Sequence, residues 1–389
     1  MELTALPVVI AAAVAAAVCV GAVPWTWDRW SRPRTARLAR TALVLLATTS
    51  VLLAGSAYVN RQAGFFPTVQ SLVTGKGAIV TVGKDGVVEA VSTRTTPLVD
   101  LQRADLRRAP GHGAVLGLPI GGGRTGLTRT GAVYLPAAYF DPTQSRVRFP
   151  VLEVLSGSPG NPAQTLHLLR LAEALDKAIA DHQMAPTVVV VPDTNGSPIR
   201  DRECVDAARG VQDDSYLTKD VQAWTTSHFR VFAPGAGWAL LGTSTGGYCA
   251  VNLSLRHPDR YAAAASLSGY FHALTDVTTG ALFDRPQQRL DNDPTWRVQH
   301  LPATPVALWL SAGTAEMGEL RGLRSFAAVL PRGSDVTTLV VPKAGHAFVA
   351  WRAVLPQALA WASSRLTPPA APPPGVAGQQ VVRPSTVRP

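Results

Sequence analysis

Residues 238–250 constrain the fold of this chain more than any other part of the sequence. They read WALLGTSTGGYCA, with a G-x-S-x-G motif centred on Ser244. The apolar run before the motif predicts the end of a buried strand, and residues 248–255 predict a helix. Glycine at 242 and 246 removes side chains where a sharp turn brings strand and helix together. The segment therefore predicts a nucleophile elbow, with Ser244 exposed at the top of a sheet.

A serine hydroxyl is a weak nucleophile, so this interpretation requires a histidine base and a carboxylate that orients it. The expected chain order is serine, acid, histidine. His346 fits the base, because it follows a predicted strand at 338–342 and precedes a helical stretch at 348–361. The settings of His257 and His112 favour surface or structural roles.

The carboxylate is predicted from its place relative to a strand. Residues 306–310 predict a buried strand, and Glu316 lies in the loop that leaves its carboxyl end. Catalytic side chains of open α/β sheets gather at such ends. Glu316 also precedes His346 in the chain, and it is our first choice for the acid. Glu319 and Asp335 remain alternatives.

Acyl transfer also requires donors aimed at the oxyanion that forms in the transition state. The first predicted donor is the backbone N–H of Thr245, directly after the nucleophile. The second is assigned to the N–H of Ser158, in a glycine-rich loop at 156–160 that follows a predicted strand at 150–155. A tight turn without catalytic meaning is the alternative for this loop.

Several segments, taken in chain order, resemble the putative esterase family. They are residues 133–139, 156–160, 188–193, the elbow, 266–271 and Gly345-His346. That family has the α/β-hydrolase fold and includes esterase D type enzymes and mycobacterial mycolyltransferases. The resemblance covers roughly residues 112 to 365 and is closest to actinobacterial membrane-anchored members. It implies that Ser244, Glu316 and His346 take the triad positions, with Ser158 and Thr245 at the oxyanion positions. Many relatives carry Met where this chain has Thr245, which keeps the N–H.

The rest of the domain alternates between strand and helix patterns. Residues 164–180 and 215–226 predict helices, the second with Trp224 packed inward, and residues 187–191 and 261–267 predict strands. Such alternation is typical of an α/β fold with a mainly parallel sheet in three layers.

Two apolar, uncharged stretches at residues 3–23 and 41–59 are each long enough to span a membrane. A cleaved signal peptide is the alternative for the first, but the acidic Glu2 and the second stretch argue against it. The segment between them, residues 24–40, contains three tryptophans, which suit the membrane interface, and five arginines, which favour the cytoplasmic side. We therefore expect a transmembrane hairpin over residues 1–59.

This topology places both termini outside the cytoplasm. It predicts an extracytoplasmic linker at residues 60–111 and an α/β-hydrolase domain at residues 112–366. Residues 367–389 are rich in proline and predict a disordered tail that contacts the cell wall. The net charge of +10 is scattered without a helical stripe, so a nucleic-acid partner is not expected.

Three cysteines occur in the chain. Cys19 lies in the first apolar stretch, and Cys204 and Cys249 are free to pair as a disulfide in an oxidising compartment. Two buried thiols are the alternative. The chain has no zinc-like spacing of Cys and His and no phosphate-binding loop, so neither a metal nor a cofactor is expected.

These observations predict a membrane-anchored, extracytoplasmic serine esterase that acts on carboxylic esters through an acyl-serine intermediate. The first alternative is an acyltransferase that moves the acyl group of an ester or acyl lipid onto an envelope sugar or lipid, because the same intermediate serves both reactions. The second alternative is a noncatalytic envelope scaffold with a hydrolase fold.

Overall fold

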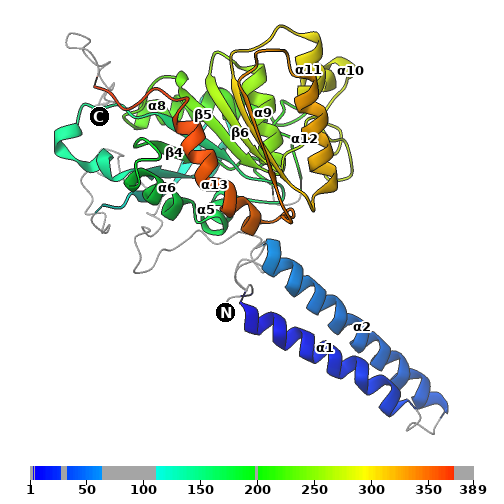
Figure 1. Cartoon of the computed structure of the whole chain (residues 1–389). Helices are drawn as coiled ribbons and strands as arrows, with labels where there is room; N and C mark the ends of the chain where they lie inside the picture. The colour runs from blue at the N-terminus through cyan, green and yellow to red at the C-terminus, as the bar shows by residue number, and fades with distance from the viewer. Residues whose placement is uncertain (1–2, 4, 28–32, 64–110, 198–199, 372–389) are drawn as a thin grey trace, which may run out of the picture. The chain divides into compact units, whose positions relative to one another are not determined.

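The computed structural model of this protein describes residues 3, 5–27, 33–63, 111–197 and 200–371 (Figure 1). The chain divides into two compact units, one from Met1 to Ile79 and one from Val80 to Pro389. The first contains two helices, and the second contains an α/β domain.

The N-terminal unit is a helical hairpin of α1 (Leu6–Thr26) and α2 (Pro33–Ala63), which lie side by side in Figure 1. Both are long and apolar enough to cross a membrane, α2 over Ala36–Tyr58. Arg40 joins them, because its guanidinium donates to the carbonyl oxygen of Trp27 and lies 5.0 Å from the Trp27 ring. The expected spans therefore fall on two candidate membrane helices.

Helix α2 begins earlier than the sequence predicts. Residues 24–40 were expected to form a loop, but α1 continues to Thr26 and α2 starts at Pro33. Proline is favoured at the first helical position, because its fixed φ suits the helix and its missing N–H would have no partner there. The basic residues that precede the second apolar stretch thus extend α2 by more than two turns.

The domain is built on one eight-stranded sheet, in the order β1-β2-β4-β3-β5-β6-β7-β8. The pairs β1–β2 and β2–β4 are antiparallel, and every pair from β4 to β8 is parallel. The predicted mainly parallel sheet is confirmed. The strands are β1 (Ala114–Gly121), β2 (Thr128–Leu135), β3 (Val151–Leu155), β4 (Val188–Val191), β5 (Gly235–Thr243), β6 (Tyr261–Leu267), β7 (Ala307–Gly313) and β8 (Val336–Val341).

Helices cover both faces of this sheet and complete the three layers. Successive strand residues point to opposite faces, so Leu240 packs in the core on one side and Leu241 in the core on the other. One face carries α5 (Pro162–Leu169), α6 (Leu171–Ala180) and α13 (Phe348–Ser363), which Figure 1 shows together. The other carries α9 (Thr245–Arg256) and α12 (Met317–Val329). Shorter elements are η1 (Ala137–Phe140), η2 (Pro142–Gln144), α7 (Asp213–Ser215), η3 (Tyr216–Val221), α8 (Gln222–His228), α10 (Pro286–Asp291) and α11 (Pro294–His300).

Two predicted helices differ in detail from those observed. The single helix expected over residues 164–180 is broken at Arg170, whose φ of 49° is left-handed and ends α5 before α6 begins. The helix expected over residues 215–226 is the π-helical η3 followed by α8. Apolar periodicity predicts that a segment is helical, but it does not report such local changes in backbone geometry.

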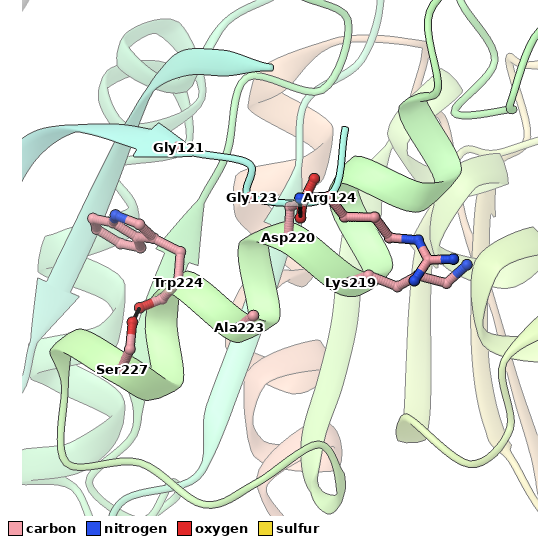
Figure 2. Close-up of a pocket in the computed structure, with 8 residues that line it drawn as sticks. All are labelled: Gly121, Gly123, Arg124, Lys219, Asp220, Ala223, Trp224 and Ser227. Carbon is pink, nitrogen blue, oxygen red and sulfur yellow. Dashed lines mark hydrogen bonds between the residues drawn. The ribbon is translucent and has the colours of Figure 1, made fainter. Parts of the chain in front are cut away.

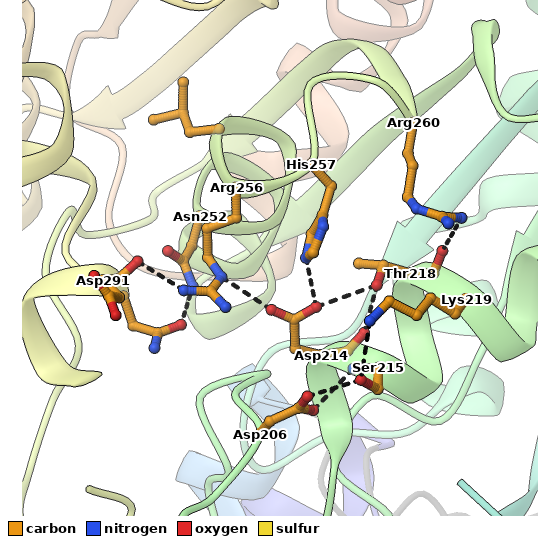
Figure 3. A network of polar contacts seen from close by, with 12 residues as sticks. Asp206, Asp214, Ser215, Thr218, Lys219, Asn252, Arg256, His257, Arg260 and Asp291 are labelled. Atoms are coloured by element: carbon orange, nitrogen blue, oxygen red, sulfur yellow. Dashed lines mark hydrogen bonds and ion pairs between the residues drawn. The ribbon is translucent and has the colours of Figure 1, made fainter. Parts of the chain in front are cut away.

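A partly buried network of polar contacts lies at the C-terminal end of α9 (Figure 3). The carboxylate of Asp214 accepts from Arg256 at 2.9 Å and pairs with His257 Nε2 at 2.6 Å. Burial alone would raise the pKa of Asp214, but these two partners outweigh it and hold the pKa below its ordinary value. His257 therefore has a structural contact here, as expected, and His112 likewise pairs with Asp176.

The first residues of the proline-rich tail are hydrogen-bonded to the domain, contrary to the prediction. Residues 367–371 were expected to be disordered, yet Thr367 donates to the carbonyl oxygen of Ala236, and Ala370 exchanges two backbone hydrogen bonds with Arg148. These bonds hold the start of the tail on the domain. The rest of the tail, 372–389, and most of the predicted linker, 64–110, lie outside the described residues.

Candidate active site

Ser244 occupies a strained position between β5 and α9. Its φ of 55° and ψ of −125° lie outside the regions that an L-residue normally adopts. A backbone hydrogen bond connects this turn to the neighbouring strand, because the N–H of Ser244 donates to the carbonyl oxygen of Leu267 in β6 at 2.9 Å. Backbone strain of this kind persists only where the surroundings enforce it, and it is typical of functional sites.

The two glycines of the motif are required by close backbone contacts. A Cβ at Gly242 would lie 1.9 Å from the carbonyl oxygen of Gly246. A Cβ at Gly246 would lie 2.2 Å from the carbonyl oxygen of Leu155, at the end of β3. Any side chain at either position would force α9 away from the sheet, so the motif sets the geometry of the elbow.

The structure brings the three predicted triad residues into one chain of hydrogen bonds. His346 Nε2 lies 2.9 Å from Ser244 Oγ, and His346 Nδ1 lies 2.7 Å from Glu316 Oε2. The three residues follow β5, β7 and β8, whose carboxyl ends lie along the same edge of the sheet. The side chain of His346 is 39% exposed, so the site is open to a substrate.

Glu316 is buried and carries a full set of hydrogen bonds. Its Oε1 accepts from the N–H of Gly313 at 2.8 Å and from the hydroxyl of Ser268 at 2.9 Å. Burial would raise the pKa of Glu316, but its hydrogen bonds with His346, Gly313 and Ser268 outweigh that cost and lower the pKa. The carboxylate is therefore charged at neutral pH and suited to accept the Nδ1 proton of His346.

The alternative acids lie farther from the histidine or at the other end of the sheet. Glu319 Oε1 is 4.0 Å from His346 Nδ1, beyond hydrogen-bond distance. Asp335 immediately precedes β8 and pairs with Arg365 at 3.1 Å. The geometry thus favours Glu316 over both.

Two residues without a predicted role contact this relay. Trp351 on α13 packs edge-to-face against the His346 ring, with centroids 5.1 Å apart, and its Nε1–H donates to Ser268 Oγ at 2.9 Å. Ser268 in turn donates to Glu316. Its position directly after the predicted strand 261–267 was the available signal, since polar residues at carboxyl ends of parallel strands meet at one edge.

The predicted oxyanion residues flank the nucleophile. A Cβ built on Gly157 would lie 3.1 Å from Ser244 Cβ, so the 156–160 loop lies against the elbow. Thr245 is the first residue of α9, where backbone N–H groups have no intrahelical partner and the helix dipole favours negative charge. The N–H groups of Thr245 and Ser158 remain our predicted donors.

Cys204 and Cys249 are joined in a disulfide. The bond links the loop that contains Asp201 and Glu203 to the first half of α9, close to the elbow. Cys249 is fully buried. Of the two arrangements left open by the sequence, the structure has the disulfide.

Glu316, Glu319 and His346 also have the side-chain types of a metal site, with candidate ligand atoms all within 4.8 Å of one another. Both nitrogens of His346 and both oxygens of Glu316 are already engaged in the relay. These contacts fit a proton relay better than a cation site.

A separate cleft of about 560 Å³ lies between the β1–β2 turn and the η3–α8 segment (Figure 2). It is lined in part by Arg124, Lys219 and Trp224, and none of the triad residues borders it. Asp220 at its centre accepts from the backbone N–H groups of Arg124 and Thr125 at 2.8 and 2.9 Å, so its carboxylate secures the β1–β2 turn.

The sheet, the elbow and the relay together define an α/β hydrolase with a nucleophilic serine. The family model described as "Putative esterase" matches residues 122–362, more than half of the chain. The chain belongs to this family, and the resemblance noted in the sequence is confirmed. Membership makes it a hydrolase or an acyltransferase.

Relatives and solved structures agree with this assignment. An uncharacterized protein of Corynebacterium glutamicum is 25% identical over 346 residues, which cover 85% of this chain and 78% of that protein. The MPT51/MPB51 antigen of Mycobacterium tuberculosis is 35% identical over 90 residues, 23% of this chain and 29% of the antigen. A ferulic acid esterase structure aligns with a TM-score of 0.57 at 17% identity, covering 66% of this chain and 99% of that one. This likeness confirms the α/β-hydrolase fold.

Proposed function

We propose that this protein is a serine esterase that cleaves carboxylic esters through an acyl-Ser244 intermediate. The observation that supports it most is the continuous relay from Ser244 through His346 to the buried Glu316. A nucleophile and base within hydrogen-bond reach, with the base oriented by a third group, is the arrangement that activates a serine hydroxyl.

The acylation step follows from these contacts. His346 Nε2 accepts the proton of Ser244 as Oγ attacks the ester carbonyl carbon, while Glu316 stabilises the imidazolium through Nδ1–H. The carbonyl oxygen becomes an oxyanion, which accepts from the N–H groups of Thr245 and Ser158. His346 then gives its proton to the departing alcohol oxygen as the ester bond breaks.

Deacylation repeats these roles with water as the nucleophile. His346 takes a proton from water, the hydroxide oxygen attacks the acyl carbon, and the proton returns to Ser244 Oγ as the acid leaves. An acceptor hydroxyl of a sugar or lipid in place of this water would make the same chain an acyltransferase. Analysis of the products in the presence of an added sugar acceptor distinguishes the two reactions.

We also propose that α1 and α2 anchor the enzyme in the cell membrane with the domain outside the cytoplasm. Both helices are long enough to span, and their side chains are largely exposed in the helical hairpin. The arginines near the turn favour the cytoplasmic side for that turn. The Cys204–Cys249 disulfide fits an oxidising, extracytoplasmic compartment.

Labelling with a fluorophosphonate probe tests the catalytic proposal. The purified chain should be labelled, and both Ser244→Ala and His346→Ala should lose the label. Circular dichroism should show that the variants remain folded. Absence of labelling in a folded parent chain would instead support a noncatalytic scaffold.

A further inference from the structure

Asp201 lies behind the two predicted oxyanion residues and contacts the side chains of both. Its Oδ2 accepts from the hydroxyl of Thr245 at 2.7 Å, and the hydroxyl of Ser158 is also hydrogen-bonded to its carboxyl group. Thr245 begins α9, whereas Ser158 belongs to the loop after β3. One buried carboxyl group, 7% exposed, therefore bridges two residues that lie 87 positions apart in the sequence. The tertiary fold brings them together.

The position of Asp201 is itself fixed by the surrounding loop. Its N–H donates to the carbonyl oxygen of Thr278 at 3.2 Å, and its Oδ1 accepts from the N–H of Glu203 at 3.1 Å. Cys204, which directly follows Glu203, is joined by the disulfide to Cys249, one helical turn beyond Thr245. The carboxyl group is thus held at a constant place relative to the start of α9.

A second carboxyl group supports this contact. Tyr270 donates to Glu203 Oε1, and the Tyr270 hydroxyl oxygen lies 3.3 Å from Thr245 Oγ1. Burial, and then the neighbouring Asp201, raise the pKa of Glu203 to about 8, which favours its protonated form at neutral pH. A protonated Glu203 adds no charge beside Asp201, whose carboxyl group accepts from Thr245, Glu203 and Ser158.

We propose that Asp201 is a positioning residue of the oxyanion hole, which fixes the separation of the Ser158 and Thr245 N–H groups through their hydroxyl groups. This inference rests on the proposed function of Ser244. Two donors from different segments must point at one oxygen in the transition state to within a fraction of an ångström. A shared acceptor behind them, anchored by a disulfide-tied loop, provides that constraint.

The first test removes the hydroxyl group of Thr245 without changing its size. In the full-length chain in detergent, Thr245→Val should lower kcat for a p-nitrophenyl ester by about 10- to 100-fold, with KM changed by less than about 3-fold. Thr245→Ser, which retains the hydroxyl, should restore kcat to within about 3-fold of the parent. Thr225→Val is the matched control, because Thr225 is equally buried but donates to a backbone carbonyl oxygen in η3. Its kcat should be unchanged.

Three further variants decide whether the effect passes through Asp201. Asp201→Asn and Ser158→Ala should each lower kcat, and the double variant Thr245→Val/Asp201→Asn should be no worse than the more impaired single variant. Strictly additive losses, or a Thr245→Val enzyme with parental kcat, would overturn the proposal. If Asp201→Asn does not fold, the half-buried Ser158→Ala decides the question by the same kcat criterion. A parent chain without esterase activity would refute the proposed function itself.

Discussion

At the scale of single residues, the elbow shows how strictly one motif is tied to backbone geometry. Ser244 has a φ of 55°, and the flanking glycines contact backbone atoms that leave no room for a Cβ. The close approach of helix and strand enforces the sharp turn that contains Ser244. Conservative changes at these positions should therefore have large effects.

Gly246→Ala should destabilise the domain by about 3 kcal/mol or more and abolish fluorophosphonate labelling, because the new methyl group would meet the carbonyl oxygen of Leu155. Thermal unfolding and labelling measure the two effects. Gly117→Ala in β1, where nothing lies within 4 Å of the added Cβ, is the control and should behave as the parent. A labelled, fully stable Gly246→Ala variant would contradict the elbow geometry.

Glu316→Gln should lower kcat on the order of 10³- to 10⁴-fold, because the uncharged amide cannot stabilise the imidazolium of His346. Steady-state kinetics with a p-nitrophenyl ester provide the measurement. Glu319→Gln, three positions further along the chain in α12, is the matched control, and its kcat should stay within about 3-fold of the parent. A reversed order of the two effects would reassign the acid to Glu319.

At the scale of elements, α9 and the 201–206 loop are held together by a disulfide. The two cysteines are separated by 45 positions, so the bond closes a long loop in the unfolded chain. The same loop carries Asp201, which reaches the side chain of Thr245 at the start of α9. We therefore expect the linkage to affect both the stability of the domain and the geometry of the candidate site.

The double variant Cys204→Ser/Cys249→Ser should be less stable than the parent by roughly 4 kcal/mol, from the entropy of closing a loop of this length. Denaturant unfolding with and without reductant measures the difference. Reductant should destabilise the parent and leave the double variant unchanged. Equal stability of parent and variant under oxidising conditions would mean that the bond contributes little.

We expect Glu153 in β3 to make the stability of the domain depend on pH. The side chain is fully buried, and burial raises its pKa from 4.5 to about 8, despite a hydrogen bond from Tyr261 that lowers it. The folded state holds the proton more tightly, so the free energy of unfolding should fall as pH rises from about 4.5 to about 8. The expected slope is up to about 1.4 kcal/mol per pH unit.

Glu153→Gln keeps a neutral acceptor for Tyr261 and should remove this contribution. The variant should be close to the parent at pH 5 and more stable than the parent at pH 8, as measured by urea unfolding at both values. Glu173→Gln on α6, where the carboxylate is exposed, is the control and should leave the pH profile unchanged. A variant that is destabilised equally at both pH values would indicate a packing effect instead.

At the scale of the whole molecule, the chain combines a pair of apolar helices with a hydrolase domain. The two are separate compact units, which allows the domain to be released without altering its core. The proposed membrane anchor is a property of the first unit alone, and the proposed chemistry belongs to the second.

The full-length chain should therefore sediment with membranes, whereas a chain of residues 60–389 should be soluble and labelled by the fluorophosphonate at a similar rate. Fractionation followed by labelling measures both properties. A membrane-impermeant probe should label the full-length chain in intact cells, with Ser244→Ala as the control. Labelling only after cell lysis would place the domain in the cytoplasm.

The sequence by itself determined the features that depend on short stretches of chain. The elbow, the strands at 187–191 and 261–267 and the two apolar helices follow from local periodicity and glycine spacing, and the structure has all of them. The order of serine, acid and histidine, together with the predicted strand at 338–342 and the helical stretch at 348–361, made His346 the candidate base.

Only the tertiary structure decided which distant groups meet. The contact of Glu316 with His346, the joining of Cys204 to Cys249 and the contact of Asp201 with Thr245 all bring together residues that lie far apart in the sequence. A hydrogen bond or a disulfide forms only within a few ångströms. Sequence patterns predict the ends of strands, but distances between side chains on different strands are set by how those strands pack.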